Sequence, residues 1–209
     1  MSKTEQILAE LSRRVSEGAL NPEAMLQMAP IGRQLPKLEW IQKQNPKRSA
    51  VLIPIYNDRI DFRTVLIRRK SYDGVHSGQI SFAGGRQEEG EVPHETALRE
   101  AHEEVGLHPN QVELTGKLSG LYIPPSNFWV EPFVARLSEQ PKLVPEPTEV
   151  EYILTPTLEE LWSTEIRTET VVQTRAGKMK VPAFDLNGEI IWGATAMILS
   201  EFIALCTLE

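Results

Sequence analysis

Apolar residues recur at helical spacing near the start of the chain. Ile7, Leu8, Leu11 and Val15 fall on one face, because residues three or four apart lie on the same side of a helix. This pattern predicts an amphipathic helix over residues 3–17. Prolines at 22, 30, 36 and 46 then interrupt the chain, which predicts an irregular segment over 21–47. We expect this N-terminal helical extension, residues 1–47, to pack on the following domain or on a second copy of the chain.

From residue 48 onward, short apolar or alternating runs are separated by turn residues, as is typical of strands. These runs predict strands at 50–56, 64–69, 79–82, 112–118 and 129–136, the last after a break at Pro124-Pro125. Residues 171–175 and 180–184 can pair as a hairpin, and Asn187-Gly188 favours a tight turn. Helices are expected at 158–163 and 194–205. The pattern predicts one mixed α/β domain over residues 48–209.

The segment GRQEEGEVPHETALREAHEEVGL, residues 85–107, predicts a further helix. Pro93 suits its first turn, where the missing N–H would be unbonded in any case. Gly106 can end it in the left-handed conformation. Glu100, Glu103 and Glu104 then fall within an arc of roughly 100°, beside an apolar stripe made of Ala97, Leu98, Ala101 and Val105. Three carboxylates therefore share one edge of a packed helix, delivered after the glycine pair Gly84-Gly85.

Such an edge is unfavourable on an ordinary surface helix. Like charges at the spacing of Glu100 and Glu104 destabilise a helix by about 0.2–0.5 kcal/mol, and the helix dipole disfavours anions near the C-terminus. We expect the nearby Arg99 to point elsewhere, so that Glu104→Gln should leave metal-free stability unchanged or raise it. Converging oxygen ligands suit Mg²⁺ or Mn²⁺. The pattern predicts a metal site rather than a solvated acidic face.

The same segment resembles the signature of the Nudix hydrolase family. The matching positions are Gly85, Glu91, Arg99-Glu100, Ala101, Glu103-Glu104 and Gly106-Leu107. The resemblance implies an α/β/α sandwich with a mixed sheet, and metal-dependent hydrolysis of a nucleoside diphosphate linked to another group. It implies that Glu100, Glu103 and Glu104 bind the metal, together with a backbone carbonyl near Gly85. By the same resemblance, Arg99 and Glu91 brace the loop and helix.

The resemblance also implies an additional carboxylate from a later loop, and Glu149 in EPTEVE fits that place. Bound cations would neutralise the diphosphate oxygens and lower the pKa of a bound water. A carboxylate then needs only to remove a proton from that water. The general base stays open among Glu100, Glu103 and Glu149.

A second resemblance concerns residues 65–85, VLIRRKSYDGVHSGQISFAGG, which look like the extra motif of the coenzyme A pyrophosphatase branch. The matches are Leu66, Arg69, Gly78, Phe82, Gly84 and Gly85, and IWGATA at 191–196 also looks like this branch. The resemblance implies cleavage of coenzyme A or its thioesters into 3′,5′-ADP and 4′-phosphopantetheine or its acyl form. Arg69, Gly78 and Gly84 are the expected substrate-binding residues.

Three positions depart from that motif. Lys70, Gly74 and Ala83 stand where a small residue, an arginine and a proline are usual. A lost arginine at Gly74 could remove a phosphate contact. Two alternatives therefore stay open: a Nudix pyrophosphatase of ADP-ribose, dinucleotides or another nucleoside diphosphate derivative, and a non-catalytic nucleotide-sensing module. The intact carboxylate set speaks against the module.

Composition narrows the expected partners and compartment. The net charge of −7 argues against broad nucleic-acid binding, which uses a basic surface. No apolar run approaches the roughly 20 residues of a membrane span, and the single cysteine, Cys206, cannot form an internal disulfide. We expect a cytoplasmic protein that binds neither nucleic acid nor membrane. Monomer and homodimer both stay open.

Overall fold

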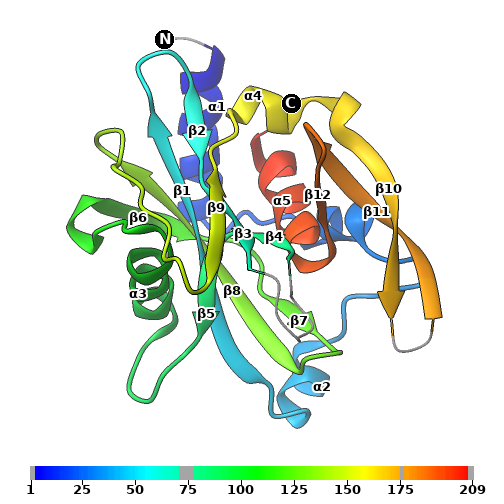
Figure 1. Cartoon of the computed structure of the whole chain (residues 1–209). Coiled ribbons are helices and arrows are strands. Elements are labelled where there is room, and N and C mark those ends of the chain that lie inside the picture. The colour runs from blue at the N-terminus through cyan, green and yellow to red at the C-terminus, as the bar shows by residue number, and fades with distance from the viewer. Residues whose placement is uncertain (1–2, 71–77, 175–176, 207–209) are drawn as a thin grey trace.

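The computed structural model describes residues 3–70, 78–174 and 177–206. Gly74 therefore lies outside the described residues. Figure 1 shows a central sheet with one helix, α3, on one side and the helices of the two chain ends on the other. None of the described helices is long and apolar enough to cross a membrane.

The N-terminal extension packs on the domain that follows it. Helix α1 spans Lys3–Ser16 and buries its predicted apolar face. The segment after α1 is not wholly irregular, because it contains a 3₁₀ helix η1 (Pro22–Met28) and a short helix α2 (Leu38–Lys43). Pro22 opens η1 at the first helical position, which proline tolerates. Buried Met25 and Met28 and a hydrogen bond from Ser200 Oγ to the carbonyl of Ala24 hold η1 on the last helix.

The main sheet is mixed, as the family resemblance implies. Its path runs β2 (Phe62–Thr64), β1 (Lys47–Asn57), β8 (Phe128–Leu137) and β6 (Val112–Lys117). Two short strands complete it, with β5 (Ala83–Arg86) beside β1 and β7 (Leu121–Ile123) beside β8. Strands β1 and β8 run parallel, and the other pairs are antiparallel.

The single strand expected at 64–69 is wrong. The chain leaves the main sheet after β2, and β3 (Leu66–Arg69) joins a second sheet with β4 (Ile80–Ser81) and β9 (Val150–Leu154). Residues 64–67 are all at most 1% exposed. Because every position in this run is buried, it lacks the alternation that would show where the pairing changes.

The glycine pair lies in a strand and not in a loop. Residues 83–86 form β5, in which Gly84 pairs with Val51 and Gly85 with Ala50 of β1. A Cβ on Gly84 would lie 2.3 Å from the carbonyl oxygen of Ala50. Glycine permits this close approach of two backbones. Strand β7 was likewise not expected, because it is only three residues long and directly precedes Pro124.

The C-terminal part follows the predicted order. It contains α4 (Leu158–Trp162), η3 (Thr164–Ile166), a hairpin of β10 (Arg167–Thr174) and β11 (Gly177–Leu186), then β12 (Glu189–Trp192) and α5 (Gly193–Cys206). Asn187 and Gly188 both have positive φ, 56° and 92°, as a two-residue hairpin turn of this kind requires. The hairpin and this turn are confirmed.

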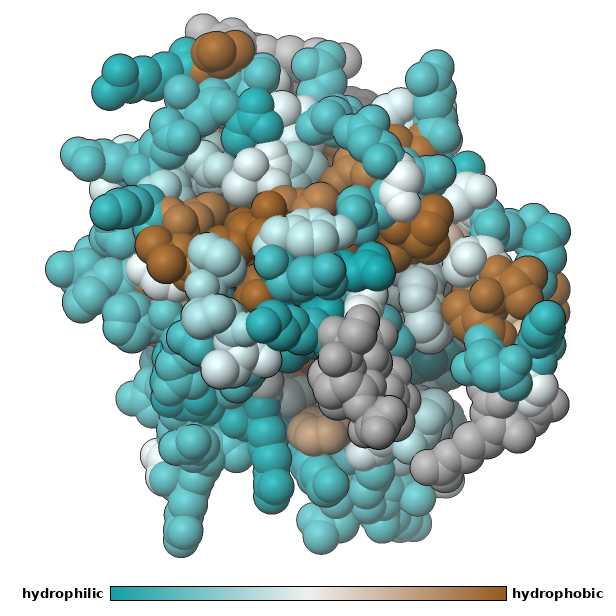
Figure 2. Space-filling view, in the orientation of Figure 1, coloured by the Kyte–Doolittle hydropathy of each residue, from teal (hydrophilic) through white to brown (hydrophobic). Residues whose placement is uncertain are grey.

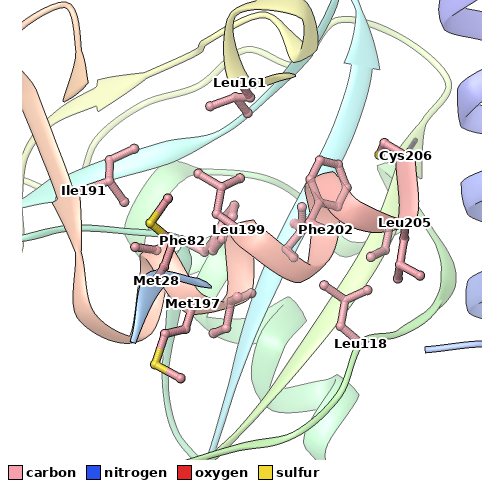
Figure 3. Packing of buried hydrophobic residues seen from close by; sticks show 14 of the residues in the cluster. Met28, Phe82, Leu118, Leu161, Ile191, Met197, Leu199, Phe202, Leu205 and Cys206 are labelled. Atoms are coloured by element: carbon pink, nitrogen blue, oxygen red, sulfur yellow. The ribbon is translucent and has the colours of Figure 1, made fainter. Parts of the chain in front are cut away.

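Two hydrophobic clusters lie on opposite faces of the main sheet. The first surrounds α5, where Phe82, Leu118 and Leu161 pack around Leu199 and Phe202 (Figure 3). The second lies under α3 (Pro93–Val105), whose Ala97, Ala101 and Val105 contact the other sheet face. The short η2 (Pro109–Gln111) links α3 to β6. This arrangement is the expected α/β/α sandwich.

The outer surface is largely hydrophilic in the view of Figure 2, with several hydrophobic patches, one of them over the β10–β11 hairpin. Val171 and Met179 on that hairpin are 61% and 39% exposed. The polar clusters described next lie at the opposite side of the fold, where α3 meets β5 and β3.

Candidate active site

Helix α3 begins and ends where its sequence predicts. Pro93 occupies the first turn, and the N–H of Val92 donates to Glu95 Oε2 at 3.0 Å. At the other end Gly106 has φ 72° and its N–H donates to the carbonyl of His102 at 3.0 Å. These caps satisfy groups that a helix end leaves unpaired, and they fix the register of the acidic edge.

Arg99 and Glu91 join the loop after β5 to the helix. Arg99 Nε donates to Glu91 Oε1 at 2.6 Å, and Arg99 Nη2 donates to the carbonyl of Arg86 at 3.1 Å. Thr96 Oγ1 also donates to Glu91 at 2.7 Å. The guanidinium of Arg99 is the main reason that the pKa of Glu91 falls to about 2. Glu91 therefore stays ionised and holds the loop against α3.

The expectation that Arg99 points away from the acidic edge is wrong. Its Nη1 donates to Glu100 Oε1 and to Glu103 Oε2, each at 2.9 Å. The long side chain folds along the helix surface, where a residue reaches its neighbour four positions on. Two of the three helix carboxylates are therefore compensated without a metal.

Glu104 is buried, and its side chain points toward β5 and β3. Only 1% of the residue is exposed. Its Oε2 accepts a hydrogen bond from the Gly84 N–H at 2.8 Å, and its Oε1 lies 2.9 Å from Arg69 Nη2. Within the described part of the chain, Oε1 still lacks a partner at hydrogen-bonding geometry. Burial raises the pKa of Glu104 to about 7, against the opposing effects of Arg69 and Gly84.

Glu100 lies directly over Gly85. A Cβ at position 85 would lie 2.4–2.6 Å from the carboxylate atoms of Glu100. Burial is the largest cause of the raised pKa of Glu100, while Arg99 lowers it. Glycine at 85 is therefore needed to leave room for the carboxylate beside the backbone.

Glu149 comes near the two buried carboxylates from a loop that precedes β9. Its charge raises the pKa of both Glu100 and Glu104. The loop is attached to the end of α3, since Val144 N–H donates to the carbonyl of Val105 and Glu146 N–H to that of Glu104, both at 2.9 Å. The structure thus brings Glu149 to the site that sequence reasoning proposed for it.

Arg69 and Arg68 point to opposite sides of β3, as strand alternation predicts. Arg69 Nη2 donates to the carbonyl of Gly84 at 2.6 Å and Nε donates to Ser81 Oγ at 3.2 Å. Arg68 Nη1 instead donates to Glu189 at 3.2 Å. Gly78 has φ 62° and its N–H donates to the carbonyl of Lys70 at 3.3 Å. The Arg69–Glu104 pair could not be predicted from the sequence, because Arg69 lies in a strand and Glu104 in a helix, and the periodicity of each element gives no information on how the two pack together.

The donor set fits an oxygen-ligated cation. Among the residues that the structure describes, no three His, Cys, Asp or Glu side chains already converge as metal ligands. Arg99 holds Glu103 outward, and Arg69 holds Glu104. Yet Glu100, Glu104 and Glu149 repel one another, and one buried oxygen of Glu104 accepts no hydrogen bond within the described residues. Such crowded carboxylates are stabilised by a hard divalent ion.

Comparisons with known proteins agree with this geometry. The NUDIX domain family model matches residues 46–173. The chain is 35% identical over 162 residues to "Nudix hydrolase 15, mitochondrial" of Arabidopsis thaliana, covering 74% of this chain and 56% of that protein. It is 30% identical over 168 residues to "Uncharacterized Nudix hydrolase NudL" of Pectobacterium atrosepticum, covering 79% and 85%.

Structural similarity extends over nearly the whole chain. A MutT/nudix family protein from Enterococcus faecalis aligns with a TM-score of 0.53 at 15% identity, covering 98% of this chain and 74% of that one. The chain spans little more than half the length of the plant relatives, 56% and 53%. The matched region contains both β5 and the acidic helix α3, and on this evidence the chain belongs to the Nudix hydrolase family.

Proposed function

We propose that this protein is a metal-dependent pyrophosphatase that hydrolyses the diphosphate bond of coenzyme A or its thioesters. The products are 3′,5′-ADP and 4′-phosphopantetheine or its acyl form. The observation that carries the reaction class is the group of Glu100, Glu104 and Glu149, whose charges act on one another beside the β5 backbone. A binding module does not need a carboxylate such as Glu104, whose burial raises its pKa to about 7.

Mg²⁺ or Mn²⁺, when bound, neutralises phosphate oxygens and lowers the pKa of a coordinated water. Glu100, Glu103 and Glu104 would hold the ion, with the carbonyl of Gly85. Arg99 and Glu91 keep the loop fixed on the helix. Glu100, Glu103 or Glu149 accepts the proton of the attacking water as the oxygen–phosphorus bond forms and the diphosphate bond breaks. Arg69, Gly78 and Gly84 line the side from which the substrate reaches β5.

The coenzyme A assignment rests on residues 65–85 and 191–196. The second candidate is hydrolysis of ADP-ribose, a dinucleotide or a related nucleoside diphosphate derivative, favoured by glycine in place of arginine at position 74. Chromatographic separation and quantification of the nucleotide products, in reactions with Mg²⁺ or Mn²⁺, distinguishes the two candidates. We expect a higher kcat/KM on coenzyme A than on ADP-ribose or NADH. Equal or better turnover of ADP-ribose would remove the coenzyme A assignment and leave the reaction class.

We also propose that the protein acts in the cytoplasm and forms a homodimer. The words mitochondrial and chloroplastic in the names of the plant relatives apply to those proteins. Light scattering after gel filtration measures the oligomeric state, and fluorescence microscopy of the tagged full chain in its native host measures the compartment.

A further inference from the structure

The guanidinium of Arg69 makes three contacts where β3, β5 and α3 meet. It lies 2.9 Å from Glu104 Oε1 and donates to the carbonyl of Gly84 at 2.6 Å and to Ser81 Oγ at 3.2 Å. The side chain of Arg69 is 20% exposed, and that of Glu104 is 2% exposed. Solvent therefore reaches the Arg69 side of the pair but not the Glu104 side.

A carboxylate as buried as Glu104 needs a counter-charge. Within the described residues, the only basic side chain in an ion pair with Glu104 is Arg69. A divalent ion on Glu104 would supply the same counter-charge at the same oxygen. Two cations cannot both sit at one buried carboxylate without strong repulsion, so Arg69 and the metal compete for it.

We propose that Arg69 is a positioning residue that occupies Glu104 in the metal-free protein and leaves it when the cation binds. This inference rests on the proposed metal-dependent function. Once released, the guanidinium retains its position beside Gly84 and turns the N–H that faced Glu104 to the diphosphate of the substrate, since a planar fork matches phosphate oxygens. Its neighbour Arg68 does not take this role, because it pairs with Glu189 and Glu151 on the other side of β3.

This exchange couples two binding events. When the metal binds alone, it must displace Arg69 from Glu104, and Arg69 is left without an anionic partner. When a diphosphate binds as well, Arg69 pairs with the diphosphate. Metal and nucleotide should therefore each tighten the binding of the other by the same factor. Arg69→Gln removes the competitor, so it should bind metal alone about tenfold more tightly, the size of effect that a nearby charge has on a carboxylate. It should also lose most of the coupling.

The coupling is tested by measuring Mn²⁺ affinity with electron paramagnetic resonance at pH 8.5. The measurement is made with and without α,β-methylene-ADP, which serves as the diphosphate ligand. Wild type, Arg69→Gln and the matched control Arg68→Gln are compared, each with circular dichroism to verify folding. We expect tighter Mn²⁺ binding only in Arg69→Gln, and a nucleotide-dependent gain only in wild type and Arg68→Gln. Arg69→Lys keeps the positive charge that competes for Glu104 but not the planar fork, so its Mn²⁺ affinity without nucleotide should stay close to that of wild type.

Unchanged or weaker Mn²⁺ binding in folded Arg69→Gln would overturn the inference, as would an equal gain in Arg68→Gln. The rate assay is independent of this result. Tighter Mn²⁺ binding in Arg69→Gln, with no diphosphate hydrolysed by wild type, would sink the proposed function and leave the competition intact. Hydrolysis by wild type, with no change of Mn²⁺ affinity in Arg69→Gln, would overturn the competition between Arg69 and the metal and leave the proposed function intact.

Discussion

The carboxylate of Glu201 in α5 accepts a hydrogen bond from the backbone N–H of Asn21, 3.1 Å away at the entrance to η1. Ser119 adds two more donors, its N–H at 3.0 Å and its hydroxyl at 2.6 Å. Glu201 is fully buried. One side chain therefore joins the N-terminal extension, the turn after β6 and the last helix.

Removing this carboxylate should loosen the extension. Glu201→Ala leaves two N–H groups without their acceptor, and we expect a loss of about 2–3 kcal/mol in the free energy of unfolding. Urea denaturation measures it. The exposed Glu23→Ala on η1 is the matched control and should change stability by less than about 0.5 kcal/mol. Equal small effects in both variants would show that the extension is held by apolar contacts alone.

The pKa of Glu104 makes the stability of the metal-free protein depend on pH. Because its folded pKa is raised from 4.5 to about 7, its contribution is fully present below about pH 4.5 and is lost as pH rises through about 7. Between pH 5 and 8.5 this amounts to about 2–3 kcal/mol. Glu104→Gln lacks the titration, so stability measured in EDTA should favour the variant increasingly as pH rises. A pH-independent difference between the two proteins contradicts this.

That result would replace the simpler expectation for Glu104→Gln drawn from helix spacing. Repulsion from Glu100 is a minor cause, because Arg99 compensates Glu100 and burial dominates at Glu104. Adding Mg²⁺ at pH 8 should stabilise wild type through ligand linkage, and Glu104→Gln should gain less. Thermal melts with and without Mg²⁺ check this.

Arg99→Gln should lower activity more than it lowers stability. The change releases Glu91, Glu100 and Glu103 together, and loss of a residue that orients metal ligands typically costs 10–100-fold in activity or metal affinity. The control is Arg86→Gln on the exposed end of β5, which should retain wild-type rates. Equal rate losses in the two variants would mean that overall charge, not the Arg99 contacts, is responsible.

Alanine at position 84 and alanine at position 85 of β5 should impair the protein for different reasons. The three atoms nearest to an added Cβ at 85 belong to the flexible end of Glu100, whereas one at 84 meets the backbone of Ala50 and Val51 at 2.3–2.7 Å. Gly85→Ala should therefore fold but lose about 10²-fold or more in kcat, since small misplacements at a reacting centre cost that much. Gly84→Ala should lose stability. Rate assays and melts on both variants distinguish them, and a fully active Gly85→Ala would show that Glu100 can move without harm.

Helix α3 and its caps were predictable from sequence because the relevant signals are local. Pro93 and Gly106 act within one turn of the helix, and the apolar stripe has a single period. The same holds for the Asn187-Gly188 turn. The break at Val65 was not predictable, because a run buried on every side has no periodicity to interpret.

Side-chain partners within the site were harder to predict than the residues themselves. Spacing placed Glu100, Glu103 and Glu104 on one edge but treated them as equivalent. In the fold, Glu103 is held outward by Arg99 while Glu104 is buried against Arg69. The Arg99–Glu103 contact lies within the helix at i, i+4 spacing. The burial of Glu104 arises from β3 and β5, which are distant in the sequence, and helical geometry alone contains no information on it.

The hydrogen bonds of Val144 and Glu146 to the last carbonyls of α3 attach the loop of Glu149 to the helix that carries Glu100 and Glu104. The three carboxylates thus form one mechanical unit, while the glycines that face them belong to the sheet. Glu104 accepts the N–H of Gly84 in β5, and the carbonyl of Glu149 accepts the N–H of Lys70 directly after β3. The acids are therefore fixed to the strands that face them, and a shift of α3 would have to break these hydrogen bonds.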